Sequence, residues 1–351
     1  MLTKMIETLK KNPRTIVFTE GTDNRILEAA SRLTADGILN VILLGNLDEV
    51  RAAAQAGNYN IENCGIMDPL SYPEMDAMVA EMLELRKGKM TEEKVRAALS
   101  QSNYFGTMLV KMGKADCLLG GATYSTADTV RPALQLIKTK PGNKIVSSCF
   151  IMVKGDEKLA MGDCAINIDP TEDDLVEIAI ESAKTAKVFG IDPKVAMLSY
   201  STLGSGKGPS VTKVANATKK IKEAAPDLAV EGEIQFDASV SPEVASIKCS
   251  GSPVAGQANT FIFPDINAGN IGYKIAARLG GYTAVGPVLQ GLNAPINDLS
   301  RGCNAEEVYS MSIVTAALSV PEEEEKIDME ELETVIRAVV ESVLAAKNLQ
   351  K

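Results

Sequence analysis

The chain has 351 residues, of which 45% are hydrophobic and 23% are charged, as is usual for a globular protein that folds in water. At roughly 150 residues per domain, this length predicts about two domains. The net charge of −10 argues against nucleic-acid binding, which needs an excess of lysine and arginine. The chain contains no histidine, which excludes Ser-His-Asp and Cys-His catalysis.

The sequence contains no apolar run near the roughly 18 residues that a membrane-spanning helix needs, and residues 1–13 have an amphipathic pattern unlike that of a signal peptide. We therefore expect a cytoplasmic protein without a membrane partner. The six cysteines are scattered and form no C-x-x-C pair, which predicts reduced thiols rather than a zinc site or a disulfide framework.

The first third of the chain alternates short apolar runs with helical periodicity, which predicts parallel α/β units. The predicted strands are residues 15–18, 40–44 and 115–119. The predicted helices are residues 1–13, 23–36, 72–87, 91–99 and 126–138. Together these elements predict one sheet with helices packed on it.

The middle of the chain predicts a second α/β domain. It begins with a hairpin of residues 144–153 and 159–166, and a helix follows whose first turn, residues 172–174, is acidic, as the helix dipole favours. The further strands are residues 195–200, 229–234, 260–263 and 282–289, and the further helices are residues 210–224 and 270–279.

Two more helices are predicted at residues 306–318 and 329–347, separated by an acidic run at 322–325 that we interpret as a solvated linker. The fold class is therefore α/β, with two α/β/α domains and largely parallel sheets. We expect the C-terminal helices to pack back on the first domain, which then comprises residues 1–143 and 304–351. Residues 144–303 form the second domain.

The segment GSGKGPS at residues 204–210 lies between a strand and a helix, where phosphate-binding loops occur. A Walker A loop needs serine or threonine where Gly208 stands, and the dinucleotide fingerprint needs glycine where Pro209 stands. Binding of a nucleoside triphosphate or NAD is therefore not supported. Contact of the loop with a phosphate or pantetheine group and a simple flexible turn both stay open.

The segment GGATYSTADTVR at residues 120–131 likewise joins a strand to a helix. Its small residues allow close approach of the backbone to a ligand, Ser125 and Thr126 supply hydroxyl donors, and Arg131 lies one turn inside the helix. This pattern predicts an anion site. The alternative is a capped helix with Arg131 paired on the surface.

The segment NDLSRGC at residues 297–303 places a hydroxyl beside a guanidinium. Arg301 offers a planar fork for two phosphate or carbonyl oxygens, and Ser300 offers its hydroxyl. Downstream, Asn304-x-x-Glu307 is a near match to a capping box, in which the glutamate binds the N-cap amide. On spacing alone the cap is favoured over a catalytic role for Glu307.

At these residues the sequence resembles the phosphate acetyltransferase family. The matching blocks are STADTVRP (125–132), FIFPDINAGNIGYK (261–274) and residues 286–303, and the resemblance runs over essentially the whole chain. It implies two α/β domains with a cleft between them, a homodimer, and reversible conversion of acetyl phosphate and CoA to acetyl-CoA and inorganic phosphate. The thiol attacks the acetyl carbonyl directly in a ternary complex. No cofactor beyond CoA is implied, and monovalent cations are expected as activators.

The resemblance also implies roles for individual residues. Ser300 orients the thiol or stabilises the developing oxyanion, and Arg301 clamps the acyl phosphate. Arg131 and Arg86 provide further cationic contacts. The hydroxyls of the 120–131 segment, on Ser125 and Thr126, complete the candidate substrate-binding set.

The base of the family is an aspartate seven positions after the serine, and Glu307 stands there in this chain. Transfer of a proton from a thiol to a carboxylate is uphill by about four pKa units, so the proton must leave as the carbon–sulfur bond forms, or arginines must lower the thiol pKa. The extra methylene moves the carboxylate by about 1 Å. Either the site accommodates Glu307, or Asp298 or Glu306 shares the role.

Three alternatives stay open. A phosphate butyryltransferase would use the same chemistry with a larger acyl pocket. A metal-dependent decarboxylating dehydrogenase has a similar two-domain architecture, but it needs a nucleotide loop and a cluster of metal-binding aspartates, for which the sequence offers no convincing candidate. A catalytically silent, ligand-sensing homologue, like the domains fused to malic enzymes, is the third.

Overall fold

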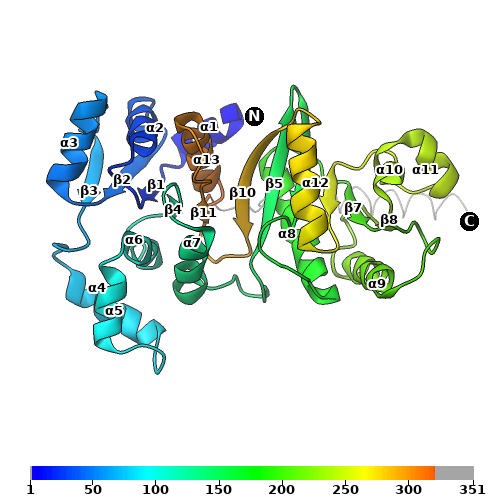
Figure 1. Cartoon of the computed structure of the whole chain (residues 1–351), viewed down its shortest axis with the longest axis horizontal. Coiled ribbons are helices and arrows are strands. Elements are labelled where there is room, and N and C mark those ends of the chain that lie inside the picture. Colours follow the sequence, from blue (N-terminus) through cyan, green and yellow to red (C-terminus); the bar gives the residue numbers. More distant parts are fainter. Residues whose placement is uncertain (1, 321–351) are drawn as a thin grey trace, which may run out of the picture. The chain divides into compact units, whose positions relative to one another are not determined.

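A computed structural model of the chain describes residues 2–320. They contain two β-sheets, one of five strands and one of six, with helices between the strands (Figure 1). The predicted α/β class with largely parallel sheets is confirmed. The predicted helix at 329–347 and the acidic run at 322–325 lie outside the described residues.

The first sheet is entirely parallel and has the strand order β11-β4-β1-β2-β3. Its strands are β1 (Thr15–Phe18), β2 (Asn40–Leu44), β3 (Cys64–Met67), β4 (Cys117–Gly120) and β11 (Ile296–Asp298). The sequence predicted β1 and β2 to the residue because both are continuous apolar runs. It missed β3, whose residues are only partly buried, and β11, which is too short to show a period.

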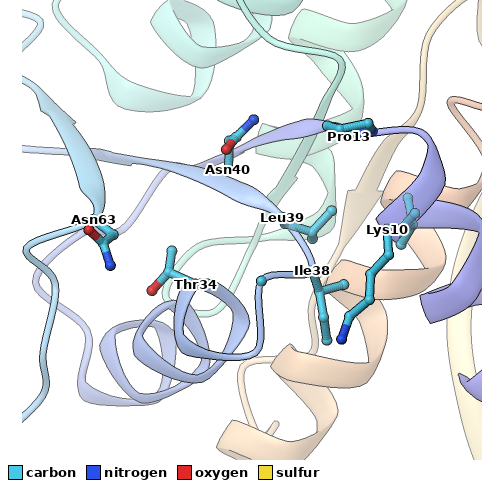
Figure 2. A pocket seen from close by; sticks show the side chains of 9 residues that line it. Lys10, Pro13, Thr34, Ile38, Leu39, Asn40 and Asn63 are labelled. Carbon is cyan, nitrogen blue, oxygen red and sulfur yellow. The ribbon is translucent and has the colours of Figure 1, made fainter.

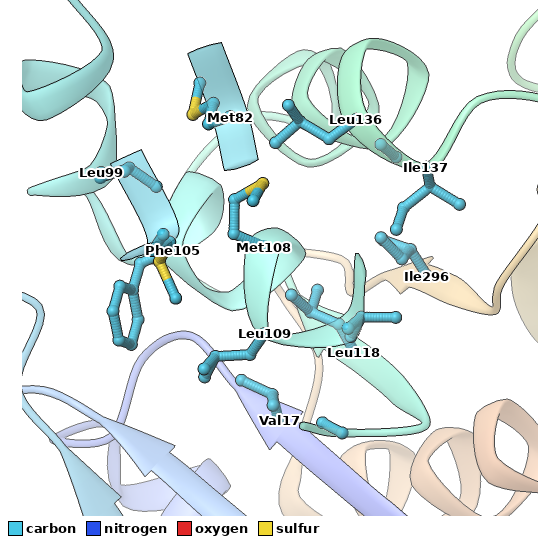
Figure 3. Close-up of a cluster of buried hydrophobic side chains, with 14 of the residues drawn as sticks. Val17, Met82, Leu99, Phe105, Met108, Leu109, Leu118, Leu136, Ile137 and Ile296 are labelled. Carbon is cyan, nitrogen blue, oxygen red and sulfur yellow. The ribbon is translucent and has the colours of Figure 1, made fainter. Parts of the chain in front are cut away.

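Helices cover the first sheet on both faces. They are α1 (Leu2–Lys11), α2 (Asn24–Ala35), α3 (Leu47–Gly57), α4 (Met75–Leu85), α5 (Glu92–Leu99), α6 (Ser102–Lys111), α7 (Thr126–Pro132), the π-helix η1 (Ala133–Ile137) and α13 (Ala305–Ala317). α13 packs against α1 and α2. On the other face, Phe105 and Met108 of α6 lie in a core with Leu136 of η1 and Leu118 of β4 (Figure 3).

One predicted helix differs from the structure, and one observed helix was not predicted. The helix predicted at 126–138 is divided, because Pro132 ends the α-helical part and the turn that follows is a π-helix. No helix was predicted for the residues of α6. Six consecutive residues of that helix, 105–110, are buried, so its apolar side chains do not form the one-sided stripe by which an amphipathic helix is detected.

The second sheet has the strand order β10-β5-β6-β9-β7-β8. Its strands are β5 (Ser147–Lys154), β6 (Glu157–Gly162), β7 (Val195–Leu198), β8 (Val230–Ile234), β9 (Thr260–Ile262) and β10 (Thr283–Gln290). The predicted hairpin is confirmed as the antiparallel pair of β5 and β6. β10 is antiparallel to β5, and β6, β9, β7 and β8 are parallel.

Two hydrophobic cores lie on this sheet. The helices are α8 (Glu172–Val188), α9 (Pro209–Ala224), α10 (Phe236–Val240), α11 (Pro242–Lys248) and α12 (Ile266–Arg278). One core joins Phe150 and Phe261 of the sheet with Tyr273 of α12, whose ring stacks on that of Phe150 with centroids 4.1 Å apart. The other joins Ile178 of α8 with Ile221 of α9.

A single buried amide links the two sheets to the last described helix. The Asn297 side chain is 0% exposed on β11; its Oδ1 accepts the N–H of Leu289 on β10 at 2.7 Å, and its Nδ2 donates to Thr315 Oγ1 on α13 at 2.9 Å. Residues 296–298 pair with β4 in the first sheet, and they precede the predicted boundary at 303/304. The division into two domains itself stays a prediction.

We expect Asn297→Ala to lower the free energy of unfolding by about 1–3 kcal/mol, because the buried N–H of Leu289 loses its acceptor. Urea unfolding followed by circular dichroism measures this. The matched control is Asn293→Ala, in the preceding loop, whose exposed side chain should matter by less than about 0.5 kcal/mol. Equal unfolding free energies for the two variants would contradict the role of the amide.

Candidate active site

Three loops meet at one edge of the first sheet. Residues 19–23, 121–125 and 299–304 follow the carboxyl ends of β1, β4 and β11, which are neighbours in the sheet. The chain runs from β1 outward to β2 and β3 and then returns to β4 on the other side of β1. In open α/β sheets, ligands bind at such a switch point, outside the carboxyl ends of the strands. We call residues 299–304 the Ser300 loop and residues 121–125 the Tyr124 loop.

Asp298 is the last residue of β11 and is only 2% exposed. Its carboxylate accepts hydrogen bonds from Thr126 Oγ1 at 2.6 Å and Thr129 Oγ1 at 2.5 Å, both on α7. Burial raises the pKa of Asp298, and the two hydroxyls oppose that shift. The pair of hydrogen bonds fixes the start of α7 to the end of β11. The sequence predicted the Thr126 hydroxyl as a donor to a ligand. In the structure this hydroxyl donates its hydrogen bond to Asp298.

Gly121 is required where the Tyr124 loop passes this carboxylate. Its φ of +95° lies in the left-handed region, and a Cβ built on it would lie 2.2 Å from Asp298 Oδ1. Any side chain here would displace the loop from β11.

A second acid, the half-buried Glu20, ties the Tyr124 loop to β1. Glu20 Oε1 accepts the backbone N–H groups of Gly121 and Thr123, each at 3.1 Å, and Oε2 accepts the Thr19 hydroxyl at 2.8 Å. Thr19 Oγ1 also lies 2.8 Å from the hydroxyl of Tyr124. Burial raises the pKa of Glu20, and these hydrogen bonds oppose the shift. The Glu20 carboxylate thus holds the backbone of the Tyr124 loop against the end of β1.

Ser300 and Arg301 are exposed on the Ser300 loop. Ser300 Oγ accepts the N–H of Gly302 at 3.2 Å, within the same loop. Among residues 2–320, no ion pair involves Arg301, so its guanidinium is available to an anion. A guanidinium with a hydroxyl beside it can bind two phosphoryl or carbonyl oxygens at once.

Ser125 and Arg131 both face Asp128 on α7. The Ser125 hydroxyl donates to Asp128 Oδ2 at 2.7 Å, and Arg131 Nη1 lies 3.5 Å from Asp128 Oδ1. The Arg131 side chain is 57% exposed, and an exposed pair of this length is weak. The structure therefore forms the surface pair that the sequence left as an alternative, while a bound anion could still replace Asp128 at Arg131.

Arg86 lies apart from these groups at the C-cap of α4. Its Nε is buried and has no hydrogen-bond partner among residues 2–320. In the part of the chain that the structure describes, no hydrogen bond or ion pair joins Arg86 to the Tyr124 loop or the Ser300 loop. Its predicted contact with substrate stays a prediction.

Glu307 forms the capping box that its spacing predicted. Asn304 Oδ1 accepts the N–H of Glu307 at 2.9 Å, and Glu307 Oε2 accepts the N–H of Asn304 at 3.3 Å. Both residues are exposed, and within residues 2–320 no hydrogen bond reaches Glu307 Oε1. The neighbouring acid, Glu306, pairs with Arg32 at 2.8 Å.

Arg25, near the start of α2, was not predicted from the sequence, and it uses all five of its N–H groups. Nε and Nη2 bind the two carboxylate oxygens of Asp23 at 2.9 and 2.7 Å. Nη2 also donates to the carbonyl of Ala122 at 2.9 Å, and Nη1 donates to the carbonyls of Arg301 at 2.9 Å and Cys303 at 3.1 Å. The hydrogen bonds to Asp23 raise the pKa of Arg25 and lower that of Asp23. A cation in the first turn of a helix, where the dipole disfavours it, was the available signal.

A buried carboxylate holds the first part of the glycine-rich loop at 204–210. Glu233 is 4% exposed, and its Oε1 accepts the N–H of Gly204 at 2.7 Å and the hydroxyl of Ser201 at 2.9 Å. The N–H of Gly206 donates to Ser201 Oγ at 2.8 Å. Among residues 2–320 no hydrogen bond uses the N–H groups of Lys207 and Gly208, so both interpretations that the sequence left open stay open.

A pocket of about 280 Å³ lies near the amino end of β2, lined by residues that include Lys10, Thr34 and Asn40 (Figure 2). It contains none of the predicted site residues. Within residues 2–320, no group of three or more cysteine, aspartate or glutamate side chains is placed to hold a metal ion. Over the same residues, no helix has the length and apolar character needed to cross a membrane.

Comparison with known proteins identifies a family for this chain. The family model described as phosphate acetyl/butaryl transferase matches residues 1–316. The phosphate acetyltransferase of Bacillus subtilis (strain 168) is 57% identical over 302 residues, which cover 86% of this chain and 94% of that protein.

Two solved structures are also similar. The EutD phosphotransacetylase from Staphylococcus aureus has 51% identity and a TM-score of 0.86, covering 91% of this chain and 98% of that one. A phosphotransacetylase from Streptococcus pyogenes has 52% identity and a TM-score of 0.88, covering 90% and 97%. The fold and these relatives define an acyltransferase. The chain belongs to the phosphate acetyl/butaryl transferase family, which confirms the resemblance found in the sequence.

Proposed function

We propose that this chain is a phosphate acetyltransferase that moves an acetyl group reversibly between acetyl phosphate and CoA. The observation that carries the proposal is the exposed pair of Ser300 and Arg301 at the carboxyl edge of the first sheet, in a chain 57% identical to a phosphate acetyltransferase. The substrates are CoA or acetyl-CoA, acetyl phosphate and inorganic phosphate.

In the proposed mechanism the CoA sulfur attacks the acetyl carbonyl carbon in a ternary complex. The carbon–sulfur bond forms, the bond from the carbonyl carbon to the phosphate oxygen breaks, and inorganic phosphate leaves. Arg301 binds the phosphoryl oxygens, whose charge rises as that bond breaks, and Ser300 orients the thiol or donates to the oxyanion. Arg131, Ser125 and Arg86 are proposed as further substrate contacts.

Glu307 is proposed to take the thiol proton through Oε1, while Oε2 keeps its hydrogen bond to the backbone of Asn304. A carboxylate is a weaker base than a thiolate by about four pKa units, so the proton leaves as the carbon–sulfur bond forms. The capping box supports this proposal because it holds the longer glutamate side chain in one orientation.

The wild-type protein should form a thioester from CoA and acetyl phosphate, with a kcat/KM about 10-fold or more above that for butyryl phosphate, since each extra methylene must fit the acyl pocket. The matched control is Arg301→Ala, which should lose at least about 100-fold in turnover because a charge-stabilising donor is removed. A butyryl preference would replace the acetyl assignment. Absence of turnover with either substrate would favour the ligand-sensing homologue.

Glu307→Gln should lower kcat by about 100-fold or more without changing the melting temperature. Glutamine also closes a capping box, but it cannot accept the proton. Initial rates and thermal denaturation measure the two effects. The matched variant is Glu306→Gln, in the same turn. Full activity of Glu307→Gln would restrict Glu307 to capping, and loss confined to Glu306→Gln would assign the proton to Glu306.

We also propose that the chain forms a homodimer through α12. Ile271, Ile275 and Leu279 are 57%, 53% and 84% exposed. Their spacing of four residues places them in one row on the helix and its C-cap. A row of exposed apolar side chains is typical of a surface that another protein covers. The homodimer implied by the family resemblance makes a second copy the proposed partner.

Light scattering should give twice the chain mass of 37.3 kDa for the wild type and the single mass for Ile275→Asp, because a buried unpaired carboxylate opposes association. The control is Ile247→Asp on α11, where the isoleucine is 81% exposed and outside the row. A monomeric wild type, or dissociation caused equally by both variants, would contradict this interface.

A further inference from the structure

We infer that Arg25 is a positioning residue that holds the Ser300 loop in register with the Tyr124 loop. This inference rests on the proposed function, because it concerns the placement of Ser300 and Arg301. Arg25 contacts the backbone of both loops, so it acts through the groups that it holds rather than on a substrate.

The middle of the Ser300 loop, residues 300–303, depends on Arg25 for its hydrogen bonds to the rest of residues 2–320. Leu299 is fixed by its N–H, which donates to the carbonyl of Gly120 at 2.7 Å. The hydrogen bonds of Ser300 and Gly302 stay within the loop. Among residues 2–320, the hydrogen bonds that reach residues 300–303 from outside the loop come from Arg25. They bind the carbonyls on both sides of Gly302, next to the exposed side chain of Arg301.

The guanidinium is itself held in a fixed orientation. Both carboxylate oxygens of Asp23 bind one edge of the guanidinium. Asp23 is also the N-cap of α2, and its side chain accepts the backbone N–H of Arg25. The side chains of Arg25 and Asp23 are 27% and 15% exposed. The Nη1 and Nη2 donors that Asp23 does not use therefore point toward the two loops from the start of α2. Such an anchor selects one loop conformation before substrate binds.

The guanidinium of Arg25 also holds the Ser300 loop at a fixed distance from the Tyr124 loop. Nη2 binds the carbonyl of Ala122 in the loop that ends at Ser125, and this loop continues into α7, which carries Arg131. One planar group therefore spans both candidate substrate-binding segments. Lysine keeps the charge, but its three donors radiate from one atom and cannot bind Asp23 and both loops together.

The experiment compares Arg25→Lys with wild type. We expect kcat for transfer from acetyl phosphate to CoA to fall by about 100-fold, the loss typical of a displacement of about 1 Å, while KM for each substrate changes by less than about threefold. Circular dichroism should show a folded protein at the assay temperature. The matched control is Arg96→Lys, because Arg96 also binds two carboxylates, Asp76 and Glu92, and should keep kcat within about twofold.

A second measurement is independent of activity. Trypsin should cleave after Arg301 faster in Arg25→Lys than in wild type, while cleavage after the exposed Lys87 stays unchanged, with both sites followed by mass spectrometry. A wild-type kcat in Arg25→Lys, an equal loss in Arg96→Lys, or unchanged cleavage after Arg301 would each overturn the role of Arg25. A wild-type protein without acetyl transfer would refute the proposed function, and the cleavage rates would then decide on Arg25.

Discussion

The buried polar pair on β11 is the constraint on which the candidate site depends. Asn297 must satisfy its amide without water, and it does so by joining β10 to α13. Asp298 must satisfy its carboxylate in the same way, and it does so with two threonine hydroxyls at the start of α7. Because unsatisfied buried polar groups are costly, these partners cannot easily be exchanged. The Ser300 loop therefore leaves the sheet from a fixed point.

The acidic and basic side chains of the site have different kinds of hydrogen-bond partner. The carboxylates of the half-buried Glu20 and the buried Asp298 accept hydrogen bonds from backbone N–H groups and hydroxyls. The guanidinium of Arg25 donates hydrogen bonds to the Asp23 carboxylate and to loop carbonyls. Arg301 is left exposed, and no ion pair within the described residues involves it. A chain with a net charge of −10 can therefore still offer a local cation to an anionic substrate.

Sequence periodicity predicted the elements whose burial is one-sided or continuous, such as α2, β1, β2 and α8. It missed α6, which is buried on most sides, and β11, which has three residues. The phosphate-loop interpretation of residues 204–210 depended on backbone N–H groups being free. The N–H group of Gly204 is bound by Glu233, which β8 brings to the loop from a distant part of the sequence. Local patterns carry no information about such a partner.

The sequence by itself determined the α/β class, the family, the Ser300–Arg301 pair and the capping box of Asn304 and Glu307. Each of these depends on residue identities in order along the chain or on partners within one helical turn. Only the tertiary structure decided that Thr126 binds Asp298 and that Arg25 binds the carbonyl of Arg301, 276 residues away. The physical reason is that a hydrogen bond between distant segments forms only after packing has brought β1, β4 and β11 side by side.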